Sequence, residues 1–99
     1  METNNITLEK NKVITKKPVH YKVIMHNDDY TSMEFVVEVL MNTFNKRFEE
    51  ANKIMIDVHK NGRGIAGIYP YDIAVTKVSV AMSMAQQEDF PFKLTIEEV

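Results

Sequence analysis

The chain has 99 residues, of which 44% are hydrophobic, so it can bury one compact core and is too short for several domains. Its formal net charge of −2 provides no field that attracts nucleic acid or an anionic membrane surface. Its lack of cysteine excludes a disulfide scaffold, a thiolate zinc site and a cysteine nucleophile. Its apolar runs are far shorter than a membrane span, and no apolar signal region is seen near the first residue. We therefore expect a cytoplasmic protein that binds neither nucleic acid nor a membrane.

The first part of the chain differs in charge from the rest. Residues 1–17 hold four lysines against two glutamates, a net charge of +2, whereas residues 18–99 hold eight basic and twelve acidic side chains, a net charge of −4. Residues 1–17 are also polar and without clear periodicity, which is typical of a flexible segment. We predict a flexible N-terminal extension over 1–17, followed by one core domain over 18–99.

The first element of the core is predicted from alternation. From Val19 to Met25, apolar side chains recur at every second position, which is typical of a β-strand with one buried face. The expected inner face carries Val19, Tyr21, Val23 and Met25, and the outer face His20, Lys22, Ile24 and His26. The run Asn27-Asp28-Asp29 ends the strand, because Asn and Asp side chains compete for local backbone hydrogen bonds.

Two helices are predicted next. Thr31 and Glu34 have the spacing of a capping box, with Thr31 as the N-cap of a helix that extends to about Phe44. Its apolar stripe comprises Met33, Val36, Val37, Leu40 and Phe44. After a short link, a second helix is expected from about Glu49 to Lys60, and Gly62 supplies its stop. The stripe of the second helix comprises Ala51, Ile54, Met55 and Val58.

The remainder of the chain predicts a strand, a helix and a strand. Residues 64–69 are apolar and contain two glycines, which indicates a short strand that another backbone approaches closely. Pro70 and Asp72 are typical of a first helical turn, and this helix is expected to end near Gln87. Alternation of Phe92, Leu94 and Ile96 predicts the last strand. The order β-α-α-β-α-β predicts an α+β fold with three helices on one face of a three-stranded antiparallel sheet.

The turn after the first strand gathers hydrogen-bond acceptors where a strand meets a helix. Asn27, Asp28 and Asp29 supply one amide and two carboxylates, and no lysine or arginine within the turn neutralises them. His59 lies late in the second helix, four residues after Met55, and so shares a face with its apolar stripe. Because a short link makes the two helices antiparallel, we expect His59 to lie near the turn.

The same pairing brings apolar side chains of the two helices together. Met33 and Val36 are expected beside Met55 and Val58, which predicts a small apolar pocket with polar acceptors at its mouth. Such a pocket suits a ligand that carries one apolar side chain next to an ammonium group. The N-terminal residue of a peptide fits, because its α-amine is largely protonated at neutral pH. Side-chain burial and charge-assisted hydrogen bonds, offset by the cost of association, predict roughly micromolar affinity.

Other interpretations of these residues stay open at this point. The acidic turn can be a helix entry only, and His59 can be a partner of the helix dipole. A metal site would draw on His20, His26, Asp28, Asp29 and His59, and a metal-dependent enzyme on the last three. However, the first two histidines are six residues apart on one strand face, and no metal-ligand spacing motif, nucleophile–base motif or phosphate loop is present. We therefore expect no metal and no cofactor, while a small metal-dependent enzyme stays open as an alternative at this point.

Six short groups of residues occur in a fixed order along the chain. They are Tyr21-Lys22-Val23-Ile24, Asn27-Asp28-Asp29-Tyr30-Thr31, Met33-Glu34-Phe35-Val36, Met55 with Val58-His59, Gly67-Ile68-Tyr69, and Ala74 with Thr76-Lys77-Val78. Together they closely resemble the ClpS family, the adaptors of the ATP-dependent Clp protease. The resemblance covers about four-fifths of the chain, from Tyr21 to the C-terminus.

The resemblance implies a function without enzymatic activity and a set of site residues. The family delivers N-end-rule substrates, which bear N-terminal Leu, Phe, Tyr or Trp, to a Clp AAA+ unfoldase of the ClpA or ClpC type. By resemblance, the substrate's α-amine is held by Asn27, Asp28, Asp29 and His59. The side-chain pocket is lined by Thr31, Met33, Val36, Met55, Val58 and Phe92, and the N-terminal domain of the unfoldase contacts Tyr30, Asp72 and Lys77. The N-terminal arm is engaged by the unfoldase during delivery.

Some positions depart from the family pattern. Ser32 stands where proline is common, and serine is well tolerated in a first helical turn. His26 replaces an apolar residue before the acidic turn and could add a second titrating group near it. Phe92 replaces leucine in the expected pocket wall, and Met33 is the expected gate against β-branched N-terminal residues. The alternative function is a ribosome-associated or general protein-interaction domain without N-terminal residue specificity, since small domains with this element order also occur there.

Overall fold

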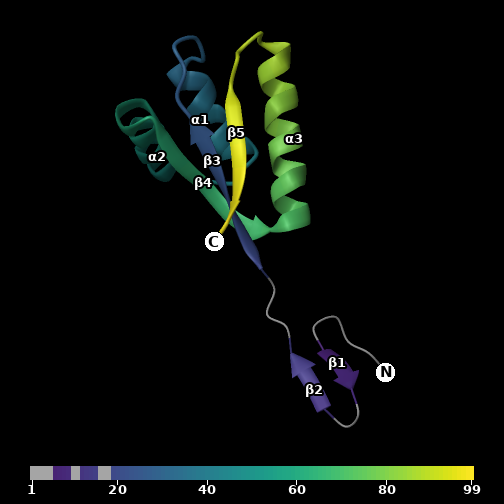
Figure 1. The fold of residues 1–99 in the computed structure, drawn as a ribbon. Helices are drawn as coiled ribbons and strands as arrows, with labels where there is room; N and C mark the ends of the chain where they lie inside the picture. Colours follow the sequence, from purple (N-terminus) through teal and green to yellow (C-terminus); the bar gives the residue numbers. More distant parts are fainter. Residues whose placement is uncertain (1–5, 10–11, 16–18) are drawn as a thin grey trace.

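The computed structural model describes residues 6–9, 12–15 and 19–99 (Figure 1). In chain order its elements are β1 (Ile6–Glu9), β2 (Lys12–Thr15), β3 (His20–His26), α1 (Met33–Asn42), α2 (Phe48–Asn61), β4 (Arg63–Pro70), α3 (Tyr71–Gln87) and β5 (Lys93–Glu98). From β3 onward the order is β-α-α-β-α-β, so the predicted α+β fold is confirmed. Within these described residues, no helix is long and apolar enough to cross a membrane.

The central strand of the antiparallel sheet is β3, in the order β4-β3-β5. At its C-terminal end, His26 lies opposite Arg63 of β4 and Lys93 of β5. Because β4 begins directly after α2, the turn that follows β3 emerges where α2 ends. The sheet register therefore places the acidic turn beside the C-terminus of α2.

The core lies between the sheet and the helices. Val23 and Met25 of β3 are fully buried. The buried side chains of α1 are Phe35, Val36, Val39 and Leu40, and those of α3 are Ala74, Ala81 and Ala85. Small alanine side chains allow a helix to pack close to its neighbours, and Figure 1 shows α3 running alongside β5. The buried face of α1 is broad, because this helix packs against α2 as well as against the core of the sheet.

The start of α1 differs from the prediction. The N-cap is Ser32, whose Oγ accepts the N–H of Phe35 at 3.1 Å. Thr31 is not the cap, because Asp28 accepts both its N–H and its hydroxyl, each at 2.7 Å. The predicted capping box of Thr31 and Glu34 is therefore wrong, and the helix begins one position later along the chain than that box implies.

The end of α2 is as predicted. Gly62 follows the helix with φ +88°, a left-handed conformation that favours glycine, and its N–H donates to the carbonyl of Val58 at 3.0 Å. The carbonyl of Gly62 in turn accepts the N–H of Asn27 at 2.9 Å. This hydrogen bond joins the end of α2 to the turn after β3.

The segment predicted as a flexible extension contains two short strands. β1 and β2 pair antiparallel, from Ile6 opposite Thr15 to Glu9 opposite Lys12. This pairing was not expected, because alternation over only four residues is too short to stand out in a polar segment. Residues 1–5, 10–11 and 16–17 of the predicted extension lie outside the described residues, and its flexibility stays a prediction.

Candidate functional site

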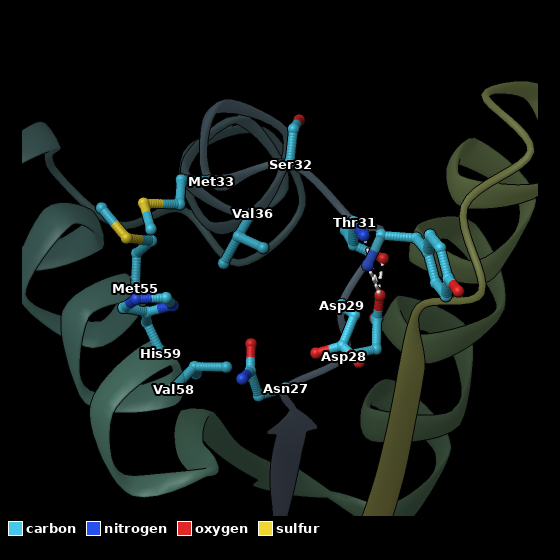
Figure 2. Close-up of a pocket in the computed structure, with 11 residues that line it drawn as sticks. Asn27, Asp28, Asp29, Thr31, Ser32, Met33, Val36, Met55, Val58 and His59 are labelled. Carbon is cyan, nitrogen blue, oxygen red and sulfur yellow. Dashed lines mark hydrogen bonds between the residues drawn. The ribbon is translucent and has the colours of Figure 1, made fainter.

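A cavity of about 370 Å³ opens where β3 ends, α1 begins and α2 ends (Figure 2). It is lined by Asn27, Asp28, Asp29, Tyr30, Thr31, Ser32, Met33, Val36, Met55, Val58 and His59. The antiparallel pairing of α1 and α2 thus brings together every residue expected at the amine site and in the pocket except Phe92. Tyr30 and Ser32 also line the cavity and were not expected there. Each lies in the sequence between two predicted site residues, and this position could have indicated that they belong to the lining.

Three polar side chains from two distant parts of the chain surround the mouth. Asn27 and Asp29 direct their side chains toward the hollow from the turn, and His59 faces them from the last turn of α2 (Figure 2). All three are exposed to solvent. The backbone bond from Asn27 to Gly62 fixes the spacing of these two segments without using any of the three side chains.

The carboxylate of Asp28 is engaged within the turn. It accepts the N–H of Tyr30 at 2.8 Å, and the N–H and hydroxyl of Thr31, each at 2.7 Å. Burial alone would raise the pKa of Asp28, but these hydrogen bonds favour the charged form and hold its pKa below the ordinary value. In contrast, Figure 2 draws no hydrogen bond from the residues around the cavity to Asp29. Asp28 therefore shapes the turn, and Asp29 is left to face the hollow.

The apolar walls combine fixed and adaptable side chains. Val36 and Val58 are 7% and 3% exposed and form the fixed part. Met33 is 45% exposed and lies next to the side chain of Met55 at one wall (Figure 2). Methionine is unbranched and adapts readily to the shape of a ligand. Behind Val58, a Cβ at Gly64 would lie 2.9 Å from Cγ2 of Val58, so glycine is needed where α2 meets β4.

Phe92 does not line this cavity, contrary to expectation. It is 2% exposed and packs edge-on against Phe35, with ring centroids 5.7 Å apart. It also borders a different hollow, between α3 and the start of β5. The aromatic ring at this position therefore belongs to the core beneath α1 and not to the pocket wall.

The three residues expected to contact the unfoldase do not form one cluster. Tyr30 is 78% exposed at the rim of the cavity, before α1, and Asp72 is exposed in the first turn of α3. Lys77 is half-buried, and its Nζ donates to the carbonyl of Thr43 at 2.7 Å and to Oδ1 of Asn45 at 3.0 Å, just after α1. Tyr30 and Lys77 are thus near opposite ends of a helix roughly 15 Å long.

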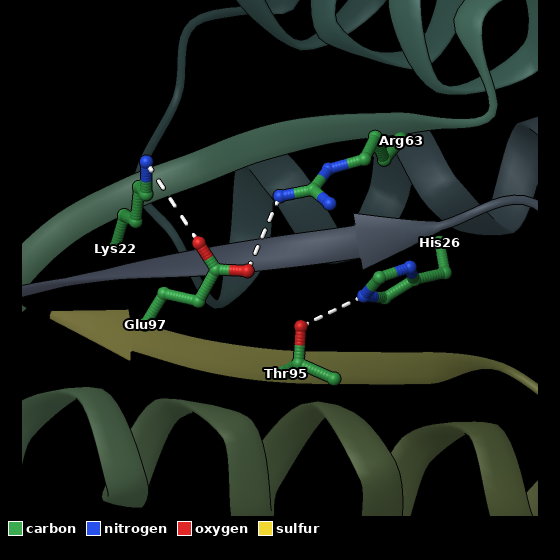
Figure 3. A network of polar contacts seen from close by, with 5 residues as sticks. All are labelled: Lys22, His26, Arg63, Thr95 and Glu97. Atoms are coloured by element: carbon green, nitrogen blue, oxygen red, sulfur yellow. Dashed lines mark hydrogen bonds and ion pairs between the residues drawn. The ribbon is translucent and has the colours of Figure 1, made fainter.

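The side chain of His26 turns away from the cavity. It forms a 2.7 Å hydrogen bond with Thr95 on the sheet face opposite the helices (Figure 3). Burial, followed by the positive charges of Lys93 and Arg63, lowers the pKa of His26, and Glu97 partly opposes them. His26 is therefore a member of the outer-face network and not of the amine site.

Glu97 is the centre of that network. It lies 3.3 Å from Nη2 of Arg63 and 3.9 Å from Nζ of Lys22, and so links all three strands of the sheet (Figure 3). Both pairs are partly exposed, so each adds at most about 1 kcal/mol to stability. In the part of the chain that the structure describes, no three His, Asp or Glu side chains are arranged to hold a metal ion.

The cavity can bind a cation that has an apolar neighbour. Asn27, Asp29 and His59 supply acceptors at the mouth, and the valine and methionine side chains supply the walls. Among the described residues, no lysine or arginine belongs to the lining. The geometry therefore suits an ammonium group attached close to one large apolar side chain.

Comparisons with known proteins place the chain in a family. The family model described as "ATP-dependent Clp protease adaptor protein ClpS" matches residues 16–95. The ClpS adapter protein of Clostridium acetobutylicum is 57% identical over 91 residues, which cover 92% of this chain and 88% of that protein. That of Wolinella succinogenes is 52% identical over 89 residues, which cover 90% of this chain and 87% of that protein.

A solved structure shares the fold. Agrobacterium tumefaciens ClpS2 bound to L-phenylalaninamide matches with a TM-score of 0.80 and 34% sequence identity, over 84% of this chain and 100% of that one. The family consists of adaptors and not of enzymes. The family model matches most of the chain, and the relatives align with it over most of its length. The chain therefore belongs to the ClpS family of ATP-dependent Clp protease adaptors.

Proposed function

We propose that the chain recognises proteins by a free N-terminal Leu, Phe, Tyr or Trp and delivers them to a Clp AAA+ unfoldase of the ClpA or ClpC type in the cytoplasm. One cavity of about 370 Å³ combines apolar walls with hydrogen-bond acceptors at its mouth, and this combination supports the proposal. The first residue of a peptide combines an apolar side chain with an adjacent ammonium group, whereas internal residues lack the ammonium group.

The ammonium group offers three N–H donors, and we assign three acceptors to it. These are the amide oxygen of Asn27, a ring nitrogen of His59, and the carboxylate of Asp29, directly or through water. Asp28 is not assigned a direct contact, because its oxygens already accept three hydrogen bonds from Tyr30 and Thr31. The negative charge of Asp28 still favours a cation nearby.

The side chain of the first residue enters between the two methionines and the two valines. Met33 stands at the exposed end of this wall, where a side chain branched at Cβ would meet it. Side chains without a branch at Cβ, such as those of Leu and the aromatic residues, are therefore preferred. The Agrobacterium relative was solved with L-phenylalaninamide, which carries an aromatic side chain and a free α-amine. That ligand has both features for which the cavity is suited.

Fluorescence anisotropy with labelled peptides tests the recognition. Peptides that begin with Leu or Phe should bind with roughly micromolar affinity. A Val peptide should bind more weakly, and acetylated Leu should lose about tenfold to a hundredfold, because acetylation removes the charge and the hydrogen-bond donors. Equal binding of Leu and acetylated Leu would refute amine recognition. Equal binding of all first residues would instead favour the general protein-interaction domain.

His59 provides a matched pair of variants. His59→Ala should weaken binding of the Leu peptide about tenfold, because an acceptor is lost. Lys60→Ala changes the next exposed residue of α2, outside the cavity lining, and should bind as the parent does. If His59→Ala binds the peptide as well as Lys60→Ala does, His59 has no part in recognition.

Delivery needs a separate measurement. ATP-dependent degradation of a reporter with N-terminal Leu, by the Clp protease of the same organism, is the readout. Asp72→Ala should reduce degradation and leave peptide affinity unchanged, because Asp72 is exposed on α3 away from the cavity. Glu88→Ala, a second exposed acid at the other end of α3, is the control. Lys77→Ala also loses the bond to Thr43, so its unfolding is measured beside its delivery.

A further inference from the structure

A second hollow lies beside the candidate site. It measures about 330 Å³ and is lined by Met33, Glu34, Val37, Phe48, Asn52 and Met55. Met33 and Met55 also line the first cavity. The two hollows are therefore neighbours across a ridge made by these two methionine side chains, which lie next to each other in Figure 2.

The second hollow is mostly apolar, with Glu34 and Asn52 as its polar members, and it is open to solvent. Phe48, the first residue of α2, is 56% exposed, and Met33 is 45% exposed. Val37 lies half-buried between them and the core. An exposed phenylalanine costs free energy in water unless it is covered by a ligand or partner. Asn52, also half-buried, adds an amide that can hydrogen-bond a peptide backbone.

An extended peptide presents alternate side chains to the same surface, as two neighbouring hollows require. In an extended chain, side chains one and three point to the same side and lie about 6.6–6.8 Å apart, while side chain two points to the other side. Met33 and Met55 are the common wall of the two hollows, so side chains one and three would lie on either side of this wall. A peptide whose first side chain fills the first cavity, and which then crosses Met33 and Met55, would place its third side chain over Val37 and Phe48.

We propose that the hollow formed by Val37, Phe48 and Asn52 is a subsite for an apolar third residue of the substrate. This inference rests on the proposed function, because it takes the first residue as the anchor. The second residue faces solvent and its side chain is not selected. The occupant is the substrate itself, since the hollow adjoins the first cavity and shares Met33 and Met55 with it.

Labelled peptides that differ at one position test the inference. With Leu as first residue, exchange of a third-residue Leu for its near-isostere Asn should weaken binding about fourfold to tenfold, as expected for partial burial of one leucine side chain. The same exchange at the second residue should change affinity by less than about twofold. Phe48→Ala should remove the third-residue preference and keep the discrimination between Leu and acetylated Leu. Ile56→Ala, a 40% exposed side chain of the same helix outside both linings, should keep both preferences.

Each contrary result has a distinct meaning. If the third residue has no effect while Leu and acetylated Leu are still distinguished, the subsite is overturned and the proposed function stands. If Leu and acetylated Leu bind equally, the proposed function fails and the subsite fails with it. If Phe48→Ala leaves peptide preference intact but weakens binding of the unfoldase N-terminal domain, the hollow belongs to the unfoldase and the inference is overturned.

Discussion

Asp28 and Asp29 are adjacent in sequence and differ in surroundings, so replacing each by asparagine should separate two roles. Asp28→Asn keeps an acceptor oxygen for the N–H groups of Tyr30 and Thr31, and the Thr31 hydroxyl can rotate to accept from the new amide. Asp29→Asn removes one negative charge from the hollow without breaking a hydrogen bond that shapes the turn. The first change should perturb the turn slightly, and the second should remove the contact that we propose for the α-amine.

The expected magnitudes follow from these contacts. Asp28→Asn weakens hydrogen bonds of 2.7–2.8 Å in a partly exposed turn, so the free energy of unfolding should fall by about 1 kcal/mol and Tm by about 4–8 °C. Its peptide affinity should stay within about threefold of the parent. Asp29→Asn should change stability by less than about 0.5 kcal/mol. It should lose a charge-assisted hydrogen bond of about 1.5–3 kcal/mol, which weakens binding roughly tenfold to a hundredfold.

Two measurements check this pair. Thermal unfolding followed by circular dichroism gives the Tm of each variant, and anisotropy of a Leu peptide, well below the lower Tm, gives affinity. Acetylated Leu peptide supplies the baseline for loss of amine recognition. The opposite pattern, in which Asp28→Asn binds at least tenfold more weakly and Asp29→Asn binds as the parent does, would refute the assignment of Asp29 to the amine.

Three further predictions concern the gate, the outer face and the packing of α2. Met33→Ala should let a Val peptide bind nearly as well as a Leu peptide in anisotropy, because the side chain proposed to meet a branched Cβ is shortened. An unchanged ratio of Leu-peptide to Val-peptide affinity would contradict a gate at Met33. The folded protein holds the pKa of His26 below its ordinary 6.5, so the unfolded chain takes up the proton first and stability falls as pH drops through 6.5 toward the folded pKa. Urea unfolding between about pH 7.5 and 5.5 should show a smaller loss of stability for His26→Gln than for the parent, and parallel losses would exclude this role. Gly64→Ala should lower the free energy of unfolding by about 1–3 kcal/mol and weaken Leu-peptide binding, because its new methyl group would lie 2.9 Å from Cγ2 of Val58. A variant with an unchanged denaturant midpoint would show that the side chain of Val58 moves away without cost.

The sequence predicts the fold well where one face of an element is buried. Alternation identifies β3, and the stop at Gly62 marks the end of α2. Periodicity fails where an element is covered on more than one side. The predicted stripe of α1 omits Phe35 and Val39, which are buried because α1 meets aromatic rings near β5 on one side and α2 on the other. Ile24 was placed on the outer face, yet it is fully buried.

The candidate site was predictable in outline because it depends on helix pairing. The short link between α1 and α2 implies an antiparallel pair, and this is sufficient to bring Met33 near His59. The division of roles between the two aspartates was not predictable, because adjacent identical side chains can be distinguished only by their hydrogen bonds. Phe92 was placed in the pocket wall by the family resemblance, which carries over a position but not the packing of a larger ring against Phe35 in the core.

The 2.9 Å bond between the N–H of Asn27 and the carbonyl of Gly62 has a kinetic consequence. It holds two acceptor-bearing segments in register through the backbone, so little chain ordering has to accompany capture of a ligand. Association should then lack a slow closing step, and the lifetime of the complex should depend mainly on the contacts made by the first residue. Under the proposed function, a bound substrate would then leave without a slow opening step when another site competes for its terminus.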